Sequence, residues 1–485
     1  MKKNLVIPTF FAFALAGAMT ARAATMVIEP GAVVKHNVKG ASGAVLCYLL
    51  DSDRGYPRKR STVDAVKALG VGSLRFPYGH LADNYLWTVP PWEDAVKGLR
   101  PAVASMDVPP AQWQWATDRD GFHPRSMDFD EYMRLCRQAG IEPLVVVNVL
   151  SFQYKGGPTR EQLVESAAAW VRYANIVRKY GVKYWQLGNE VEKQDGKSSL
   201  TKELYTDIYG RMAAAMKKVD PSIRIGTGVM NNVEWNRMVL EKYPSLVNWV
   251  ATHQYTWHIP LRSYDYKGWM EYGDVYVPSV VRTQQLLDSN PAWKNVELLI
   301  TETNSSGSGT EWVDGSSANL YKSLLFFEMN TEELSMRSVK YTYFWATRSP
   351  WLGENVAGRP LEQLFDKDNN FTSQGQIVQL INRYFLPRVL DVKKGEDYLR
   401  FRASMSEDGG EITFFALNKG DKADDVEFSV DGAAAWTLVE KIEFSGRSPQ
   451  DEFPTVKRRA LNNSAKTITS PLPPCSLTIF RLKKQ

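Results

Sequence analysis

Residues 159–190 read TREQLVESAAAWVRYANIVRKYGVKYWQLGNE, and this stretch decides the fold. Thr159 and Gln162 have the spacing of a capping box at a helix start, and apolar residues then recur every three or four positions. The spacing predicts a helix over Arg160–Tyr180 that ends at a glycine, followed by a short buried strand over Tyr184–Leu187. Short apolar strands that alternate with amphipathic helices are typical of a parallel sheet covered by helices.

The same alternation extends over most of the chain. Helical patterns fill most of the intervals between short apolar or β-branched runs. Eight such units in about 340 residues predict a (β/α)8 TIM barrel. The eight predicted strands are Val45–Leu50, Ser73–Phe76, Leu144–Val149, Tyr184–Leu187, Arg224–Gly228, Trp249–Tyr255, Val296–Thr301 and Ser338–Trp345. Further helices are predicted at 128–139, 202–219, 318–330 and 372–384.

The pattern changes after about residue 390. Short alternating strands separated by turn residues predict a C-terminal antiparallel β-sandwich. We therefore divide the chain into a barrel over 41–388 and a sandwich over 389–485, and we expect strands within 24–40 to join the sandwich. The sandwich strands are predicted at 398–404, 411–417, 425–430, 436–444 and 476–482.

The first 23 residues have the pattern of a secretory signal peptide. Two lysines precede an apolar stretch from Leu5 to about Met19, and Ala21-Arg22-Ala23 fits a small-x-small cleavage site. A membrane anchor is the alternative, but the stretch is short for a bilayer span and no later run of that kind follows. The sequence predicts a secreted or periplasmic protein with no membrane span.

Composition excludes several classes of protein. With 44% hydrophobic and 23% charged residues, the chain is neither disordered nor a small disulfide scaffold. A net charge of +5 is weak for 485 residues and does not indicate nucleic-acid binding. The three cysteines lack metal-ligand spacing, and Cys47 and Cys136 lie in apolar runs. Because the five histidines are also scattered, we predict no metal and no cofactor.

Two glutamates follow buried strands of the predicted barrel. Glu190 comes after the fourth strand and Glu302 at the end of the seventh. The carboxyl ends of barrel strands meet at one mouth, where barrel enzymes keep their active sites. Glycoside hydrolysis needs a pair of carboxyl groups, so the pair predicts that chemistry. Strand-end acids can also be solvated or ion-paired, and Glu192 and Glu271 are rival candidates.

Aromatic residues gather in two long insertions at this mouth. One insertion spans 78–127 and contains Trp87, Trp92, Trp113 and Trp115, and the other spans 256–278 and begins with Trp257. Aromatic faces stack on sugar rings, so we predict Trp87 and Trp257 as walls of the substrate site. The alternative is that these aromatics pack only their own loops.

Several short motifs carry a family resemblance. The stretches are Leu74-Arg75-Phe76-Pro77, Ile141-Glu142-Pro143-Leu144-Val145-Val146-Val147-Asn148, Lys183-Tyr184-Trp185-Gln186-Leu187-Gly188-Asn189-Glu190, His253-Gln254-Tyr255 and Pro473-Pro474-Cys475-Ser476-Leu477-Thr478. With them the chain resembles clan A retaining glycoside hydrolases, and in particular the α-L-arabinofuranosidase group, glycoside hydrolase family 51.

The resemblance implies a role for each matching residue. Glu190 would be the acid/base, Glu302 the nucleophile, and Arg75 the partner that keeps Glu302 ionised. Asn189 would bind the hydroxyl beside the reacting carbon. Other implied substrate-site residues are His253 and Tyr255 near the carboxylates, Asn148 on the cleft floor and Trp345 below the reacting sugar. Without the resemblance, Arg75 reads as a barrel-mouth ion pair, His253 as a packing residue and Trp345 as core.

The chain also departs from the family pattern. The family has Pro-Gly-Gly-Asn where this chain has Pro77-Tyr78-Gly79-His80, and Trp-Asn where this chain has Thr303-Asn304. The glutamate that the family carries after the first strand has no clear equivalent within 47–51. The contacts that select arabinofuranose therefore look changed, while the carboxylate machinery is kept.

The sequence predicts a secreted retaining glycoside hydrolase whose partner is a plant or algal cell-wall polysaccharide or oligosaccharide. The alternatives are an endo-acting β-glycanase of the xylanase, glucanase or agarase type, a polysaccharide lyase, and a non-catalytic carbohydrate-binding protein. The retaining mechanism also predicts a raised pKa for Glu190, which must begin the reaction protonated. Sugar, linkage and oligomeric state stay open at this point.

Overall fold

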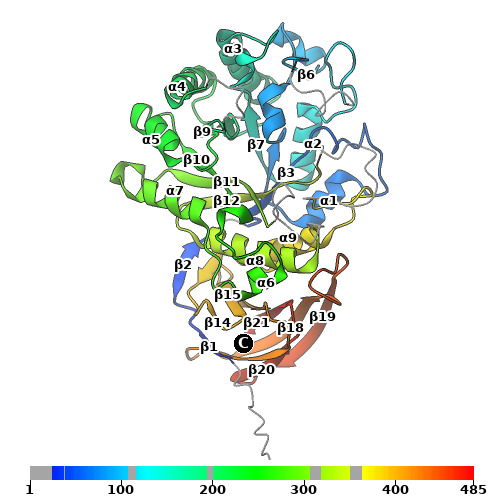
Figure 1. The fold of residues 1–485 in the computed structure, drawn as a ribbon, viewed down its shortest axis with the longest axis vertical. Helices are drawn as coiled ribbons and strands as arrows, with labels where there is room; N and C mark the ends of the chain where they lie inside the picture. The colour runs from blue at the N-terminus through cyan, green and yellow to red at the C-terminus, as the bar shows by residue number, and fades with distance from the viewer. Residues whose placement is uncertain (1–23, 38, 108–115, 194–199, 306–317, 350–362) are drawn as a thin grey trace, which may run out of the picture.

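A computed structural model describes residues 24–37, 39–107, 116–193, 200–305, 318–349 and 363–485 (Figure 1). The predicted signal peptide over 1–23 lies outside these residues, as do Trp113 and Trp115. Within the described ranges, no helix combines the length and the apolar character that a bilayer crossing requires.

Eight parallel strands close into a barrel, and the prediction of a (β/α)8 fold is confirmed. Each strand pairs with its neighbour in the chain order of a TIM barrel, and the eighth pairs with the first. The strands are β3 (Ser42–Val45), β4 (Ser73–Phe76), β7 (Glu142–Val147), β8 (Tyr184–Leu187), β9 (Arg224–Thr227), β10 (Trp249–Tyr255), β11 (Glu297–Asn304) and β12 (Val339–Phe344).

The first barrel strand begins and ends earlier than predicted. Strand β3 stops at Val45, because the chain turns at Cys47, whose carbonyl accepts the backbone N–H groups of Leu50 and Asp51. The apolar run over 46–50 is buried without being a strand. An apolar run alone does not distinguish a buried strand from a buried turn.

Helices surround the barrel and connect its strands. They are α1 (Thr62–Leu69), α2 (Phe129–Ala139), α3 (Arg160–Val171), α4 (Lys202–Val219), α5 (Val233–Lys242), α6 (Tyr266–Glu271), α7 (Pro278–Asp288), α8 (Leu320–Ser335) and α9 (Ser373–Tyr384). The capping box at Thr159 and Gln162 is formed as predicted. The helix then continues as a π-helix, η5 (Arg172–Val177), whose wider turn changes the buried face. Val177 falls at the spacing of the apolar residues of the predicted helix, but it is 47% exposed.

Short elements lie in the loops between the barrel strands. They are η1 (His80–Asn84), β5 (Tyr85–Leu86), η2 (Trp92–Lys97), β6 (Ala102–Val103), η4 (Ser151–Gln153), η6 (Thr256–His258) and η7 (Pro291–Trp293). Strands β5 and β6 form a small antiparallel pair. Helix η1 begins four residues after β4 and therefore lies at the mouth of the barrel.

Two β-sheets form the C-terminal part of the molecule. The larger has the order β19-β18-β21-β16-β15-β13-β2, with β14 beside β15, and the smaller has the order β1-β17-β20. Strands β1 (Ala24–Ile28) and β2 (Val33–His36) thus lie in these sheets, paired with β17 and β13. The other strands are β13 (Arg388–Leu390), β14 (Gly395–Glu396), β15 (Leu399–Met405), β16 (Glu411–Asn418), β17 (Asp424–Val430), β18 (Trp436–Ser445), β19 (Thr455–Asn463), β20 (Thr467–Leu472) and β21 (Ser476–Lys484).

Helices α6 and α8 lie between the barrel and the sheets (Figure 1). The α6 side chain Trp269 donates its Nε1–H to Glu328 of α8 (2.9 Å), and Lys419, just after β16, lies 3.3 Å from the same carboxylate. Trp269 is completely buried. This part of the second aromatic insertion therefore joins the barrel to the sandwich, instead of forming the predicted wall over the barrel mouth.

Candidate active site

Glu190 and Glu302 project from the mouth of the barrel. Glu302 lies on β11, and Glu190 follows β8 after a tight turn in which Gly188 and Glu190 have positive φ angles of 84° and 44°. A non-glycine residue in the left-handed region is uncommon and costs energy, and such residues cluster at functional sites. Both glutamates are buried.

The two carboxyl groups lie close together around His253. His253 Nδ1 lies 3.1 Å from Oε1 of Glu190 and 3.4 Å from Oε2 of Glu302, and the three groups offer atoms within 4.8 Å of one another. Retaining glycosidases place their carboxyl groups about 5 Å apart, whereas inverting enzymes leave about 6.5–9.5 Å for a water molecule. The spacing suits a retaining mechanism.

Glu302 has a buried cation and a hydroxyl donor in direct contact with its carboxyl group. Arg75 lies 2.9 Å from Oε1 through Nη1, and Tyr255 donates its hydroxyl to Oε2 at 2.6 Å. A fixed cation and a hydroxyl donor both favour a carboxylate. The Arg75 side chain is fully buried, with Nε directed to Gln186 (2.9 Å) and Nη2 to Asn189 (2.6 Å). Glu302 is therefore suited to act as a nucleophile.

Asn189 has one unused donor at the site. Its Oδ1 accepts from Arg75, while its buried Nδ2 has no hydrogen-bond partner among the described residues. Buried polar groups are normally paired, so an unpaired amide beside two carboxylates indicates a place for a ligand oxygen.

The expectation of a raised pKa for Glu190 is wrong for this unliganded structure. Burial raises the pKa of Glu190, but its contacts with His253 and His80 outweigh burial and hold that pKa well below its usual range. His80 was named in the sequence only as a departure from the family pattern. Its Nε2 lies 2.7 Å from Oε2 of Glu190, so the sequence reasoning missed a residue in direct contact with the acid/base.

Aromatic rings surround the carboxylate pair. The Trp257 ring stacks on Tyr255 with centroids 4.1 Å apart and an interplanar angle of 10°. The Trp345 ring packs on Tyr78 at 4.3 Å. At Gly79, an added Cβ would lie 2.5 Å from the Trp345 ring and 2.7 Å from Oε1 of Glu302, so only glycine allows this close approach.

The structure contradicts one predicted substrate contact, Trp87, and gives a second, Asn148, hydrogen bonds within the protein. Trp87 is 1% exposed and stacks on Trp170 of α3 with an interplanar angle of 8°, so it packs its own loop onto the helix layer. Asn148 accepts the backbone N–H groups of Leu150 and Ser151 and donates to the Tyr85 carbonyl, so its amide supports loops.

Neither rival acid belongs to the carboxylate pair. Glu192 accepts three backbone N–H groups, from Met230, Asn231 and Asn232, and so holds the loop after β9. Glu271 is exposed and lies 3.7 Å from Lys267 on the same short helix. Glu190 and Glu302 are therefore the candidates for the reaction.

The carboxylate pair and His253 are spaced closely enough for a divalent cation. However, the buried Arg75 already supplies a fixed positive charge 2.9 Å from Glu302. A cation bound here would meet that charge at short range, which opposes binding. We assign no metal to this cluster.

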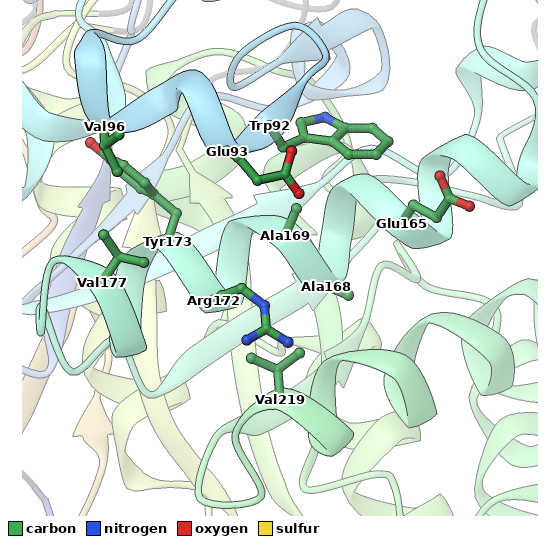
Figure 2. Close-up of a pocket in the computed structure, with 10 residues that line it drawn as sticks. All are labelled: Trp92, Glu93, Val96, Glu165, Ala168, Ala169, Arg172, Tyr173, Val177 and Val219. Atoms are coloured by element: carbon green, nitrogen blue, oxygen red, sulfur yellow. The ribbon is translucent and has the colours of Figure 1, made fainter.

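A separate groove of about 500 Å³ lies on the outer side of the barrel, between η2 and the α3–η5 helix (Figure 2). Trp92 and Glu93 line one side, while Arg172 and Tyr173 come from the π-helix. None of the residues that line it belongs to the carboxylate cluster, so this groove is not the candidate active site.

Comparisons with known proteins agree with this geometry. The alpha-L-arabinofuranosidase 1 domain family model matches residues 65–270. The chain is 27% identical over 209 residues to a probable alpha-L-arabinofuranosidase C of Aspergillus fumigatus, and 24% identical over 239 residues to an intracellular exo-alpha-(1->5)-L-arabinofuranosidase of Acetivibrio thermocellus. The matches cover 40% and 46% of this chain but 36% and 44% of those proteins, so the chain matches less than half of each relative.

The fold has close structural neighbours. A crystal structure of the alpha-L-arabinofuranosidase from Thermotoga maritima in complex with arabinose superposes with a TM-score of 0.73. The superposition covers 95% of this chain and all of that one, at 17% sequence identity. The whole architecture of barrel and sheets is therefore shared with that structure.

Proposed function

We propose that this protein, which resembles α-L-arabinofuranosidases in sequence and in fold, is a retaining glycoside hydrolase of that type. The observation that carries the proposal is the pair of buried carboxyl groups around His253, with Arg75 and Tyr255 directed at Glu302. Its substrate is a plant or algal cell-wall polysaccharide, or an oligosaccharide derived from one. The N-terminal pattern of residues 1–23 supports export, while one relative carries the name intracellular.

The mechanism is a double displacement. Glu302 attacks the anomeric carbon while Glu190 protonates the leaving oxygen, and a glycosyl-enzyme forms. Glu190 then takes a proton from water, which displaces Glu302 and restores the original anomeric configuration. His253, between the two carboxyl groups, donates one hydrogen bond through Nδ1 and orients Glu190. The unpaired Nδ2 of Asn189 is placed to bind a sugar hydroxyl.

The stereochemical outcome tests this proposal. Purified protein is incubated with 4-nitrophenyl α-L-arabinofuranoside and with a panel of wall polysaccharides, and proton NMR follows the first anomer released. We expect the retained anomer. Release of the inverted anomer contradicts the retaining mechanism, an unsaturated product that absorbs in the ultraviolet indicates a lyase, and no turnover of any substrate contradicts an enzymatic role.

An endo-acting β-glycanase is the second candidate, because His80 and Thr303 replace family residues beside the carboxylates. Trp257→Ala distinguishes the two candidates, since Trp257 stacks on the tyrosine that contacts the nucleophile. For an exo-acting pocket we expect Trp257→Ala to lower kcat/KM about tenfold on short and long substrates alike. This factor corresponds to the loss of one aromatic contact of about 1–1.5 kcal/mol.

A selective loss on long substrates, measured by product sizing and kinetics over a series of chain lengths, favours the endo candidate instead. Trp87→Phe serves as the matched control, because Trp87 is buried away from solvent and its loss should alter stability without altering chain-length preference. Equal kinetics for Trp257→Ala and the native protein on every substrate contradict a substrate contact at Trp257.

A further inference from the structure

His80 stands against the acid/base at the point where the sequence departs from the family pattern. Its Nε2 lies 2.7 Å from Oε2 of Glu190, and its Nδ1 lies 3.9 Å from Asp83 on the same short helix. The other oxygen of Glu190 faces His253 at 3.1 Å. Each oxygen of Glu190 therefore lies near an imidazole nitrogen, although only the contact with His253 has hydrogen-bond geometry. His80 belongs to η1 after β4, and His253 belongs to β10.

His80 also connects the buried acid/base to solvent. The side chain of Glu190 is 4% exposed, and those of His253 and Glu302 are 0% and 4% exposed, whereas that of His80 is 31% exposed. Lys193 is a further exposed neighbour, 3.4 Å from Oε2 of Glu190 and 3.4 Å from Nε2 of His80, but an amine is intrinsically more basic than an imidazole by about four pH units and so gives up its proton less readily. A proton that reaches Glu190 from water therefore has its most direct route through His80.

Resting on the proposed function, we propose that His80 is a positioning residue that holds the proton of the acid/base in the free enzyme and passes it to Glu190 when substrate covers the site. In the transfer, the His80 ring turns to direct its Nε2–H at Oε2 of Glu190, the Nε2–H bond breaks and an O–H bond forms on Oε2. Glu190 then gives this proton to the leaving oxygen. The proton that Glu190 later takes from water returns to His80, so the cycle closes without another reactant.

Electrostatics agree with a proton that rests on His80 in the free enzyme. Burial lowers the pKa of His80, but contacts with Asp83 and Glu190 outweigh burial and raise that pKa to about 10. Burial raises the pKa of Asp83 to about 6, against the lowering effect of His80. A substrate over the mouth removes water from His80, and removal of water disfavours the charged forms of both partners. The ion pair of His80 and Glu190 then becomes a neutral pair, with the proton on Glu190.

The titratable and charged groups around this pair come from several elements of the described structure. They are Asp83 of η1, Lys193 after β8, His253 of β10, His258 of η6, and the Glu302 of β11 that lies 3.4 Å from His253. Arg75 of β4 adds a fixed charge at Glu302. Among the described residues that contact Glu190, His80 is the one that also faces Asp83 and is exposed to solvent.

The first experiment measures the proton directly and does not depend on turnover. Imidazole resonances of the native protein are titrated by NMR, with the His80 signal assigned by its loss in His80→Asn. We expect His80 to titrate several pH units above 6.5, and to titrate at least about one unit lower in Glu190→Gln, which removes the negative charge. A His80 signal that titrates near 6.5, or that is unchanged in Glu190→Gln, overturns the proposal.

The second experiment measures the pH dependence of kcat/KM for His80→Asn, with His80→Gln as a second variant. The alkaline limb of the profile reports loss of the proton from the free enzyme. In the His80 variants we expect this limb to move at least about two pH units lower, because Glu190 must then hold the proton without an imidazole partner. At pH 8 we expect about a tenfold loss on 4-nitrophenyl α-L-arabinofuranoside and less than about a threefold loss on the 2,4-dinitrophenyl substrate, which needs no acid.

His36→Asn is the matched control, since the His36 side chain is 65% exposed on β2 and faces Glu407. Its profile should match the native one. Lys193→Gln separates a nearby charge from proton storage, because it should move the alkaline limb by less than the His80 variants do. An alkaline limb that stays unchanged in both His80 variants contradicts the proposed role of His80. If the native protein hydrolyses no substrate, the proposed function is contradicted instead, and the NMR titration decides whether His80 holds the proton.

Discussion

We expect Glu302→Gln to lower kcat by about 10⁴-fold or more on every glycoside that the native protein hydrolyses, since removal of a nucleophile costs on this scale. An amide cannot form the glycosyl-enzyme, and in this site its neighbours Arg75 and Tyr255 are directed at a carboxylate. Initial rates under single-turnover conditions measure the loss. Activity within tenfold of the native protein would show that Glu302 is not the nucleophile.

Glu297→Gln is the matched control for this variant. Glu297 opens the same strand at the opposite end of the barrel, where it pairs with Arg224 (2.9 Å) and Lys340 (3.0 Å). Glu297→Gln should keep the full activity of the native protein. Thermal unfolding by circular dichroism should show both variants folded, with Glu302→Gln the less stable, because it leaves the buried Arg75 without its carboxylate partner.

Glu190→Ala loses about 10²–10⁴-fold in kcat/KM on substrates with poor leaving groups, the range expected for loss of a general acid. On 2,4-dinitrophenyl glycosides the first step needs no acid, so the glycosyl-enzyme should accumulate and give a burst of released phenol. Azide fits the space left by the side chain and needs no general base, so it should restore turnover and yield a glycosyl azide of retained configuration. No burst and no azide product would contradict the role of Glu190.

Glu192→Gln tests the rival assignment beside it. Glu192 holds the loop after β9 through its Oε1, and glutamine keeps an oxygen at that position. We expect activity within a few-fold of the native protein and no effect of azide. A loss as large as that of Glu190→Ala would instead place Glu192 in the reaction.

The barrel and its carboxylate pair could be predicted from the sequence because both follow from local patterns. Short buried strands between capped helices give the (β/α)8 fold, and residues at the ends of parallel strands must meet at one mouth. The edge strand β19 was missed because Thr455–Asn463 is charged and almost fully exposed, and β20 because its sequence contains a proline.

Side chains in the long loops could not be placed from the sequence. Trp87 and Trp257 both lie in long, aromatic-rich loops. Trp87 packs against α3, whereas Trp257 stacks on Tyr255, the tyrosine that contacts Glu302. His80 became recognisable only when the turn after β4 brought it to Glu190. The sign of the Glu190 pKa shift depends on the contacts with His253 and His80, because they lower the pKa that burial raises.

The first strand of the described chain finds its partner almost at the other end of the sequence. Ala24 of β1 lies opposite Val426 of β17, so the whole barrel is a loop of about 400 residues inside the smaller sheet. At a synthesis rate of about 5–20 residues per second, β1 waits roughly 20–80 s on the ribosome before β17 exists. The entropy of closing so long a loop grows only slowly with its length. The last barrel helix, α9, ends at Tyr384, about 40 residues before β17 begins, so the whole barrel exists roughly 2–8 s before β17 does. The barrel can therefore fold first, and the smaller sheet then joins the first strand of the described chain to its C-terminal part.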